Sequence, residues 1–392
     1  MLLSSLLVVS GRANYTNLSR YSELSERSYR RHFNEGVGFE GVNQQVIGAS
    51  TGADSIQILV VDCTFNEKSG RATPGLDWFY NGKVQQVECG LEWSVVAVVD
   101  LQQHTAYALS AQQTEAGIAA RVAAAQSEGK VCGNRVDFYL GHLAYCQSYV
   151  PQRVNYVVAD SFYSKRKWVD GVLKLGWHSI GKLRQDADLK YLYQGPRRPG
   201  PGRQRKYDGK VNPHQLDLKH FQHETTLNDG SQLWTAQVWS VSLARRIRLV
   251  CLIRRSQQTV HYALLFSTDV HLAAADVVRY YQARFQIEFL FRDARQFTGM
   301  VDSQSRNSNA LDTHVNASLT ALNLAKAAIR KDLAAPEQPA PDVVSFSIAS
   351  LKRRALNEHL FNLFIRLFAL DPTLLKLNPN YQNFLNYGSL RA

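Results

Sequence analysis

The stretch "IQILVVDCTF", residues 56–65, predicts a buried β-strand that carries a carboxylate. Its short run of aliphatic and β-branched residues is typical of a strand covered on both faces, and Asp62 ends that run. A similar stretch, "VNYVVADSFYSK" at residues 154–165, places Asp160 after a second apolar run. A single aspartate at a strand end is more often a turn former. Two stretches of the same design favour an acidic site at the C-terminal edge of a sheet.

The segments around these two stretches alternate between strand and helix patterns. They are "EWSVVAVVD" (92–100), "HTAYALSA" (104–111), "QTEAGIAARVAAAQSEG" (113–129), "VDFYLGHLAYCQSYV" (136–150), "KRKWVDGVLKLG" (165–176) and "WHSIGKL" (177–183). The first two alternate like paired strands, the next two and the fifth have helical character, and the last is a strand. Residues 51–183 are therefore expected to form an α/β core with the order strand, strand, strand, helix, strand, helix, strand.

The stretch "YYQARFQIEFLFRDARQF", residues 280–297, predicts a helix that combines aromatic residues with a charged stripe. At the helical period, five residues share one narrow face: Tyr281, Arg284, Glu288, Arg292 and Arg295. A helix that is apolar on its other sides is expected to be buried, and a buried carboxylate needs a charged partner or a metal ion. Ion pairs from Glu288 to Arg284 and Arg292, four residues away on either side, are one interpretation, and a metal site is the other.

The remaining regions differ in composition from this core. Residues 1–50 are expected to be helical and basic: either a DNA-contacting helix–turn–helix-like element, abrupt enough at its start to be truncated, or a surface helix packed by tyrosines and leucines. A basic Gly/Pro loop followed by alternating strands predicts a β-rich insertion over residues 184–272. Helical patterns return in residues 273–332. A proline-rich linker at 335–341 and further helices are expected within residues 333–392.

Composition limits the class of protein and of partner. The 392 residues are 45% hydrophobic and 20% charged, as in ordinary globular proteins. A formal net charge of +12 favours a polyanionic partner, nucleic acid before an acidic membrane surface. Five scattered cysteines without C-x-x-C spacing predict reduced thiols in a cytosolic compartment. No apolar run is long enough to span a bilayer, so we expect a cytoplasmic protein without a membrane partner.

Three carboxylates on separate elements define the chemistry that we expect. Asp62, Asp160 and Glu288 can converge to hold two Mg²⁺ ions, which promote phosphodiester cleavage by a water or a 3′-hydroxyl. Hard oxygen ligands suit Mg²⁺ or Mn²⁺ and argue against zinc. The side chains of Tyr281, Arg284 and Arg295, on the stripe of Glu288, can then bind the phosphates that flank the scissile bond.

The spacing of four residues resembles a known signature. Tyr281, Arg284, Glu288 and Arg295, at the spacing Y-x2-R-x3-E-x6-R, resemble the Tyr-Arg-Glu-Lys signature of bacterial insertion-sequence DDE transposases of the insertion-sequence-four family. The sequence departs from that signature at its last position, where Arg295 replaces the family's lysine. Arginine keeps the charge, but a planar guanidinium is not equivalent to a compact ammonium group.

The resemblance extends to both aspartate stretches and covers about residues 55 to 330. It implies an RNase H-like catalytic core interrupted by the β-rich insertion, with helical N- and C-terminal parts. It also implies Mg²⁺-dependent strand cleavage at the terminal inverted repeats of a mobile element, followed by attack of the freed 3′-hydroxyl on target DNA. A homodimer on DNA and a nucleoid-associated location in a bacterium are further implications.

Two other functions stay open at this stage. An RNase H-like structure-specific nuclease that cuts without strand transfer would use the same acids and metal ions. A catalytically silent, domesticated DNA-binding protein is the second alternative. Retention of Asp62, Asp160 and Glu288 counts against it, whereas Arg295 keeps it open.

Overall fold

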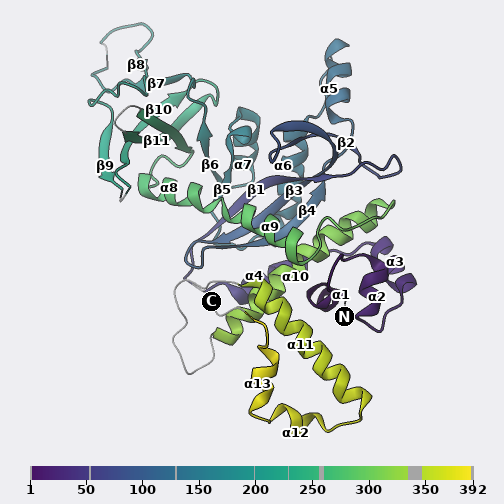
Figure 1. Ribbon diagram of the computed structural model, residues 1–392. Coiled ribbons are helices and arrows are strands. Elements are labelled where there is room, and N and C mark those ends of the chain that lie inside the picture. Colours follow the sequence, from purple (N-terminus) through teal and green to yellow (C-terminus); the bar gives the residue numbers. More distant parts are fainter. Residues whose placement is uncertain are drawn as a thin grey trace.

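The chain forms a mixed α/β fold in which helices cover a long sheet (Figure 1). The computed structural model describes residues 2–52, 54–128, 130–197, 199–227, 229–255, 260–333 and 347–389. The linker expected at residues 335–341 and the last residue of the helical stretch 113–129, Gly129, lie outside these residues. No helix in the described part of the chain is both long and apolar enough to cross a membrane.

A 12-stranded sheet runs through the described chain. Its strands are β1 (Gln57–Glu67), β2 (Asp77–Asn81), β3 (Gln86–Asp100), β4 (Thr105–Gln113), β5 (Tyr156–Ala159), β6 (His178–Leu183), β7 (Leu189–Leu192), β8 (Tyr207–Lys210), β9 (Gln222–Thr226), β10 (Gln232–Ser240), β11 (Arg245–Arg255) and β12 (Val260–Ser267). Their spatial order is β2-β3-β1-β5-β6-β12-β11-β10-β7-β8, with β4 paired to β3 and β9 to β10. The strand–helix order expected for the core is present, with two additions: the short strand β2, and a second helix before β5, since both α5 and α6 lie there.

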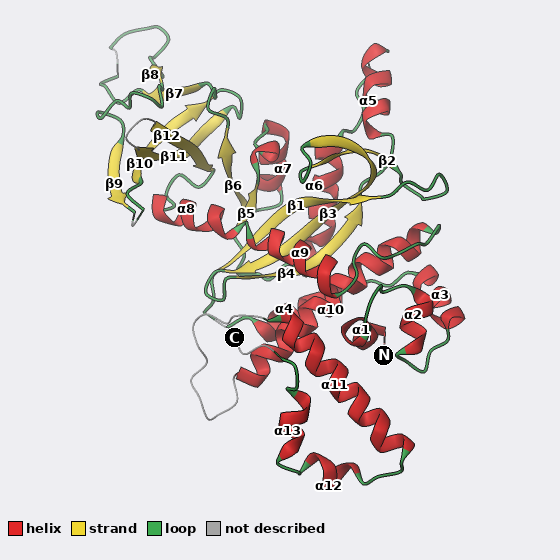
Figure 2. Ribbon diagram, in the orientation of Figure 1, coloured by secondary structure: helices red, strands yellow, loops and turns green. Residues whose placement is uncertain are grey.

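Helices flank this sheet and build the two ends of the chain (Figure 2). They are α1 (Leu2–Val8), α2 (Tyr15–Arg20), α3 (Glu26–Glu35), α4 (Glu40–Ser50), α5 (Ile118–Ser127), α6 (Arg135–Cys146), η1 (Gln147–Tyr149), η2 (Ser161–Tyr163), α7 (Arg166–Lys174), α8 (Ala274–Ala283), α9 (Gln286–Phe297), α10 (Ser308–Leu333), α11 (Ile348–Leu367), α12 (Pro372–Lys376) and α13 (Asn380–Leu385). The η elements are single 3₁₀ turns.

The two faces of the sheet pack against different helices. Leu59 and Val61 of β1 belong to the core that includes α6 and α7, whereas Ile58 and Val60 belong to the core that includes α8, α9 and α10. Successive side chains of a strand project to opposite faces. Asp62 therefore falls on the face of α8 to α10.

The prediction that the first strand ends at Asp62 is wrong. β1 continues to Glu67, because its partner β3 is 15 residues long and pairs with β1 from Gly90 to Asp100. Asp62 is thus an interior strand residue, opposite Val95. The second strand, β5, does end at Ala159, immediately before Asp160, as expected.

The strands between β6 and α8 extend the same sheet. β12 pairs antiparallel with β6, and β11 and β10 come next in the spatial order, so the described part of residues 184–272 contains the alternating strands that were expected. Figure 1 shows β7 to β11 grouped at one end of the molecule, away from α9 and α10. An ion pair between Arg245 of β11 and Asp170 of α7 ties this end to the core.

The N-terminal helices pack on α10 through a separate apolar cluster. Leu18, Tyr29 and Phe33 contact a strip of alanines on α10 that includes Ala317. The packing by tyrosines and leucines expected for a surface helix is therefore present. The five cysteines are all free, as predicted.

Candidate active site

Asp62 and Asp160 lie side by side because of the register between two parallel strands. Val61 of β1 lies opposite Ala159 of β5, so an aspartate follows each of these paired residues: Asp62 within β1 and Asp160 immediately after β5. Both aspartates follow a residue of the α6-side core, and alternation directs both to the opposite face of the sheet. The carboxylate of Asp160 also accepts a hydrogen bond from the backbone N–H of Phe162 (2.8 Å) and thereby caps η2.

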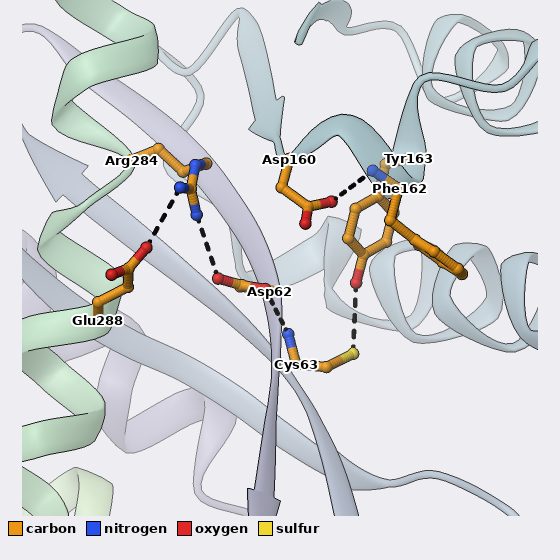
Figure 3. A network of polar contacts seen from close by, with 7 residues as sticks. All are labelled: Asp62, Cys63, Asp160, Phe162, Tyr163, Arg284 and Glu288. Carbon is orange, nitrogen blue, oxygen red and sulfur yellow. Dashed lines mark hydrogen bonds and ion pairs between the residues drawn. The ribbon is translucent and has the colours of Figure 1, made fainter. Parts of the chain in front are cut away.

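Glu288 approaches these aspartates from α9 (Figure 3). The continuous helix expected over residues 280–297 is divided, since α8 ends at Ala283 and α9 begins at Gln286. Between them, the N–H of Glu288 donates to the carbonyl of Phe285, three residues back, at 3.1 Å. Such a bond tightens the chain into a 3₁₀-like turn. Figure 3 shows the three carboxylates around one shared space.

The prediction that Glu288 is buried is wrong. Its side chain is 50% exposed, and the neighbouring Phe285 and Phe289 are each 47% exposed. Only one side of α9, which includes Ile287 and Leu290, enters the core. The other side borders the cavity, where Glu288 is accessible to a ligand.

Arg284 is a buried charge on this stretch. Only 7% of its surface is exposed, and its guanidinium donates to Asp62 Oδ2 and to Glu288 Oε1, both at 3.2 Å (Figure 3). The guanidinium also lies over the rings of Phe285 (4.7 Å) and Tyr281 (5.8 Å). The expected ion pair between Glu288 and Arg284 is therefore present. It is one arm of a bridge that joins two carboxylates.

The expected second partner of Glu288 pairs elsewhere. Arg292 binds the adjacent Asp293 at 2.9 Å, and its guanidinium lies 4.9 Å from the centre of the Phe289 ring. Among the described residues, Glu288 therefore forms an ion pair with Arg284, four residues before it, and not with Arg292, four residues after it.

The electrostatics of Asp62 reflect its crowded position. Burial raises the pKa of Asp62 to about 7, and the negative charges of Asp160 and Glu288 act in the same direction. Arg284 and the backbone N–H of Cys63, which donates to Asp62 Oδ1 at 2.8 Å, lower that pKa. A carboxylate whose ionised form is disfavoured in this way gains most from a cation placed beside it.

The other two residues predicted to bind DNA are integrated into the fold. Arg295 Nη2 donates to the carbonyl of Phe65 at 2.7 Å and to the hydroxyl of Thr64, so one guanidinium nitrogen holds two acceptors on β1. Tyr281 is half-buried beside Arg284, and burial raises the pKa of its phenol. Arg284 and Arg295 therefore both bind groups of the protein itself in this structure.

One cavity of about 880 Å³ contains all three carboxylates. Its charged lining residues are Asp62, Asp160, Glu288, Glu92, Lys83, Arg135, Arg292 and Arg295. The acids gather at the floor formed by the strands and α9. Cations from three separate segments complete the wall, as a polyanion in the cavity would require.

The carboxylates are suitable ligands for a divalent cation, although they do not form a ready-made site. Within the described residues, no group of three or more His, Cys, Asp or Glu side chains has the spacing of a preformed metal centre. Oxygen donors of this kind suit Mg²⁺ or Mn²⁺. The guanidinium of Arg284 supplies the positive charge between Asp62 and Glu288.

Sequence reasoning missed a second polar network beneath Asp62. Glu92 of β3 accepts a hydrogen bond from the hydroxyl of Tyr139 (2.7 Å), and Cys63 Sγ contacts the hydroxyl of Tyr163 (3.3 Å). The signal was available in "EWSVVAVVD", where a carboxylate opens an otherwise apolar strand. A buried carboxylate of this kind requires a partner.

Comparison with known proteins provides an independent observation. Residues 140–324 match the family model described as the transposase DDE domain. This match supports a DDE transposase. The matched residues include Asp160 and Glu288, whereas Asp62 lies outside them. No curated protein matches the chain.

Proposed function

We propose that the chain is a metal-dependent transposase that cleaves DNA at the ends of an insertion sequence and joins the freed 3′-hydroxyl to target DNA. One observation carries the proposal. Asp62 and Asp160 directly follow a pair of residues, Val61 and Ala159, on neighbouring parallel strands, and both aspartates share a cavity with Glu288. The match to the transposase DDE domain supports the general class, and the carboxylates support the reaction.

The topology supports an RNase H-like core for this enzyme. The strand order β4-β3-β1-β5-β6, with parallel pairs only among β1, β5 and β6, corresponds to residues 51–183. The helices in residues 273–332 would complete this core after the insertion at 184–272. Residues 1–50 and 333–392 would be the helical terminal parts. The spacing from Tyr281 to Arg295 supports the insertion-sequence-four family.

Three residues would hold two divalent ions, Mg²⁺ or Mn²⁺: Asp62, Asp160 and Glu288. When bound, such ions activate an attacking water or 3′-hydroxyl and stabilise the leaving oxygen. Arg284 now pairs with two of these residues. A guanidinium binds phosphate oxygens with the same two-pronged geometry as carboxylate oxygens. Arg284 would therefore exchange its carboxylate partners for a DNA phosphate.

A joining assay tests this function. The substrate would be a labelled duplex that carries the terminal repeats found in the DNA flanking the reading frame, mixed with a target plasmid. With Mg²⁺ or Mn²⁺ we expect cleavage followed by joining, and we expect neither product from Asp160→Asn. Cleavage without joining would indicate a structure-specific nuclease instead.

A catalytically silent DNA-binding protein is the second candidate. The bridge from Arg284 to Asp62 and Glu288 favours it, because an internal ion pair can replace the metal ions in holding the carboxylates. DNA binding by the unchanged protein without cleavage in either metal would establish this function. The proposed transposase would act as a homodimer on DNA. Sedimentation of the protein–DNA complex would test whether it contains two copies of the chain.

A further inference from the structure

Trp78 and Tyr80 are exposed aromatic side chains beside the candidate active site. They lie two residues apart on β2 and therefore project from the same face of that strand. Trp78 is 63% exposed and Tyr80 is 56% exposed. Tyr80 lines the cavity that contains Asp62, Asp160 and Glu288. The aromatic face of β2 is thus continuous with the site of the proposed reaction.

Trp78 differs from the other tryptophans of the chain. The other five are buried or half-buried: Trp93, Trp168, Trp177, Trp234 and Trp239. Within the described residues, neither the ring of Trp78 nor the ring of Tyr80 packs against another aromatic ring or lies under a cation. Large aromatic surfaces contribute most when they leave water. Because Trp78 and Tyr80 stay exposed, they gain little of this burial free energy on folding. Their apolar surface is therefore accessible to a ligand.

The strand that carries them is held firmly. The side chain of Asn81 donates to Glu88 (2.6 Å) across the hairpin and accepts from the backbone N–H of Lys83 (3.0 Å) in the turn. Arg135 of α6 donates to the carbonyl of Trp78 at 3.1 Å. A rigid platform loses little conformational freedom on binding, which favours a recognition role over random exposure.

Cations accompany the aromatic rings. Lys83 in the β2–β3 turn and Arg135 at the start of α6 line the same cavity as Tyr80. Aromatic rings for bases, combined with cations for phosphates, are the features by which proteins bind single-stranded nucleic acid. Bases in a duplex already stack on one another, so only unpaired bases offer a free face to such rings.

We propose that Trp78 and Tyr80 form a base-stacking subsite for unpaired nucleotides of the DNA strand that enters the catalytic cavity. This inference rests on the proposed DNA-cleaving function and adds to it a preference for locally opened DNA. Lys83 and Arg135 would contact the phosphates of the same nucleotides.

Binding to matched oligonucleotides tests the subsite. A blunt duplex is compared with the same duplex carrying an unpaired tail of either polarity with 2-aminopurine in the tail, in Ca²⁺ to prevent cleavage. The unchanged protein should bind one tailed duplex more tightly and quench the 2-aminopurine fluorescence. Trp78→Ala and Tyr80→Ala should each weaken tailed-duplex binding by roughly fivefold to a hundredfold, and leave blunt-duplex affinity and the salt dependence unchanged.

Three variants serve as controls. Tyr80→Phe should bind like the unchanged protein, because it keeps the ring. Tyr145→Ala removes an exposed tyrosine that does not line the cavity and should have no effect. Lys83→Ala should weaken binding of the tailed duplex and, unlike the two alanine variants of the aromatic residues, lower its salt slope by about one unit.

The outcomes separate this inference from the function on which it rests. If the unchanged protein binds DNA but Trp78→Ala and Tyr80→Ala retain its preference for the tailed duplex, the subsite is refuted and the proposed function stands. Absence of any DNA binding refutes both. If the variants instead lower the sedimented mass of the protein and leave the preference intact, the face is a contact between copies of the chain, and the subsite is again refuted.

Discussion

Two sides of the candidate active-site cavity differ in whether their polar and aromatic side chains already have partners within the protein. On the first, which we call the arginine side, Arg284 bridges Asp62 and Glu288. On the second, which we call the hairpin side, Trp78 and Tyr80 face water on a firmly held strand. The arginine side satisfies its own charges without a ligand, whereas the hairpin side leaves apolar rings in solvent.

This difference indicates on which side a ligand must break existing contacts and on which side it can bind without breaking any. A ligand on the arginine side must compete with existing ion pairs, so binding there involves an exchange of partners. A ligand on the hairpin side covers exposed rings without displacing any protein contact. DNA would therefore meet a preformed surface first and a charge-paired centre second.

The largest effect is expected at the arginine side. Glu288→Gln keeps the shape of the side chain but removes a metal-binding charge, so Mg²⁺-dependent cleavage should fall at least about a thousandfold, or about 4 kcal/mol. DNA affinity in Ca²⁺ should persist, because the hairpin side is intact. A cleavage time course and a binding titration measure the two quantities.

Glu23→Gln provides the control for that comparison. Glu23 is an exposed carboxylate that pairs with Arg366 far along the chain, and its loss should leave cleavage unchanged. Cleavage by Glu288→Gln at the unchanged protein's rate would remove Glu288 from the site and end the distinction between the two sides.

A smaller effect is expected on the pH dependence of folding stability, through helix α6, which contacts the hairpin side. α6 carries both Arg135 and the buried His142, and burial lowers the pKa of His142 to about 4 from 6.5. Between pH 6.5 and 4 the unfolded chain binds this proton and the folded chain does not, so stability falls as the pH falls. The loss is at most about 3 kcal/mol.

The variant His142→Gln should flatten this part of the stability curve. Urea unfolding at several pH values between 6.5 and 4 measures the slope, with the exposed His271→Gln as the control. An identical slope in the His142 variant and the unchanged protein would show that this histidine titrates normally and does not couple α6 to pH.

The smallest effect is expected when the bridge itself is removed. Arg284→Ala leaves Asp62 and Glu288 without their shared partner and should destabilise the metal-free protein by roughly 2 kcal/mol. The value is below that for a fully buried pair because Glu288 is half exposed. Thermal unfolding with and without Mg²⁺ measures it, with Arg292→Ala as the matched control.

Mg²⁺ should reduce the difference between Arg284→Ala and the unchanged protein, since bound cations replace the lost positive charge. The DNA affinity of the variant should also depend less on salt, by about one unit of slope, if Arg284 turns to a phosphate. A difference in melting temperature that Mg²⁺ does not alter would show that the guanidinium and the metal ions occupy separate places.

Local sequence patterns were sufficient to predict several features of the site. The runs before Asp62 and Asp160 are strongly β-forming, and two parallel strands of this kind can align their ends. The helical spacing from Arg284 to Glu288 brings the two side chains within reach of an ion pair. In each case neighbours in sequence set the outcome.

Other features depended on partners distant in sequence. β1 passes Asp62 because the long strand β3 continues beside it, and no pattern within residues 56–65 reveals that partner. Glu288 was predicted to be buried and is half exposed, whereas the burial of Arg284 was not predicted. The helix period fixes which residues share a face but not what that face meets.

By itself, the sequence determined which segments become strands and helices and which residues carry charge, because hydrophobic periodicity and side-chain chemistry are local properties. Tertiary structure alone decided that Arg284 reaches Asp62, 222 residues away, and that Trp78 and Tyr80 remain in solvent beside the cavity. The physical reason is that burial and ion pairing depend on which surfaces meet after folding, and those surfaces come from segments far apart in the chain.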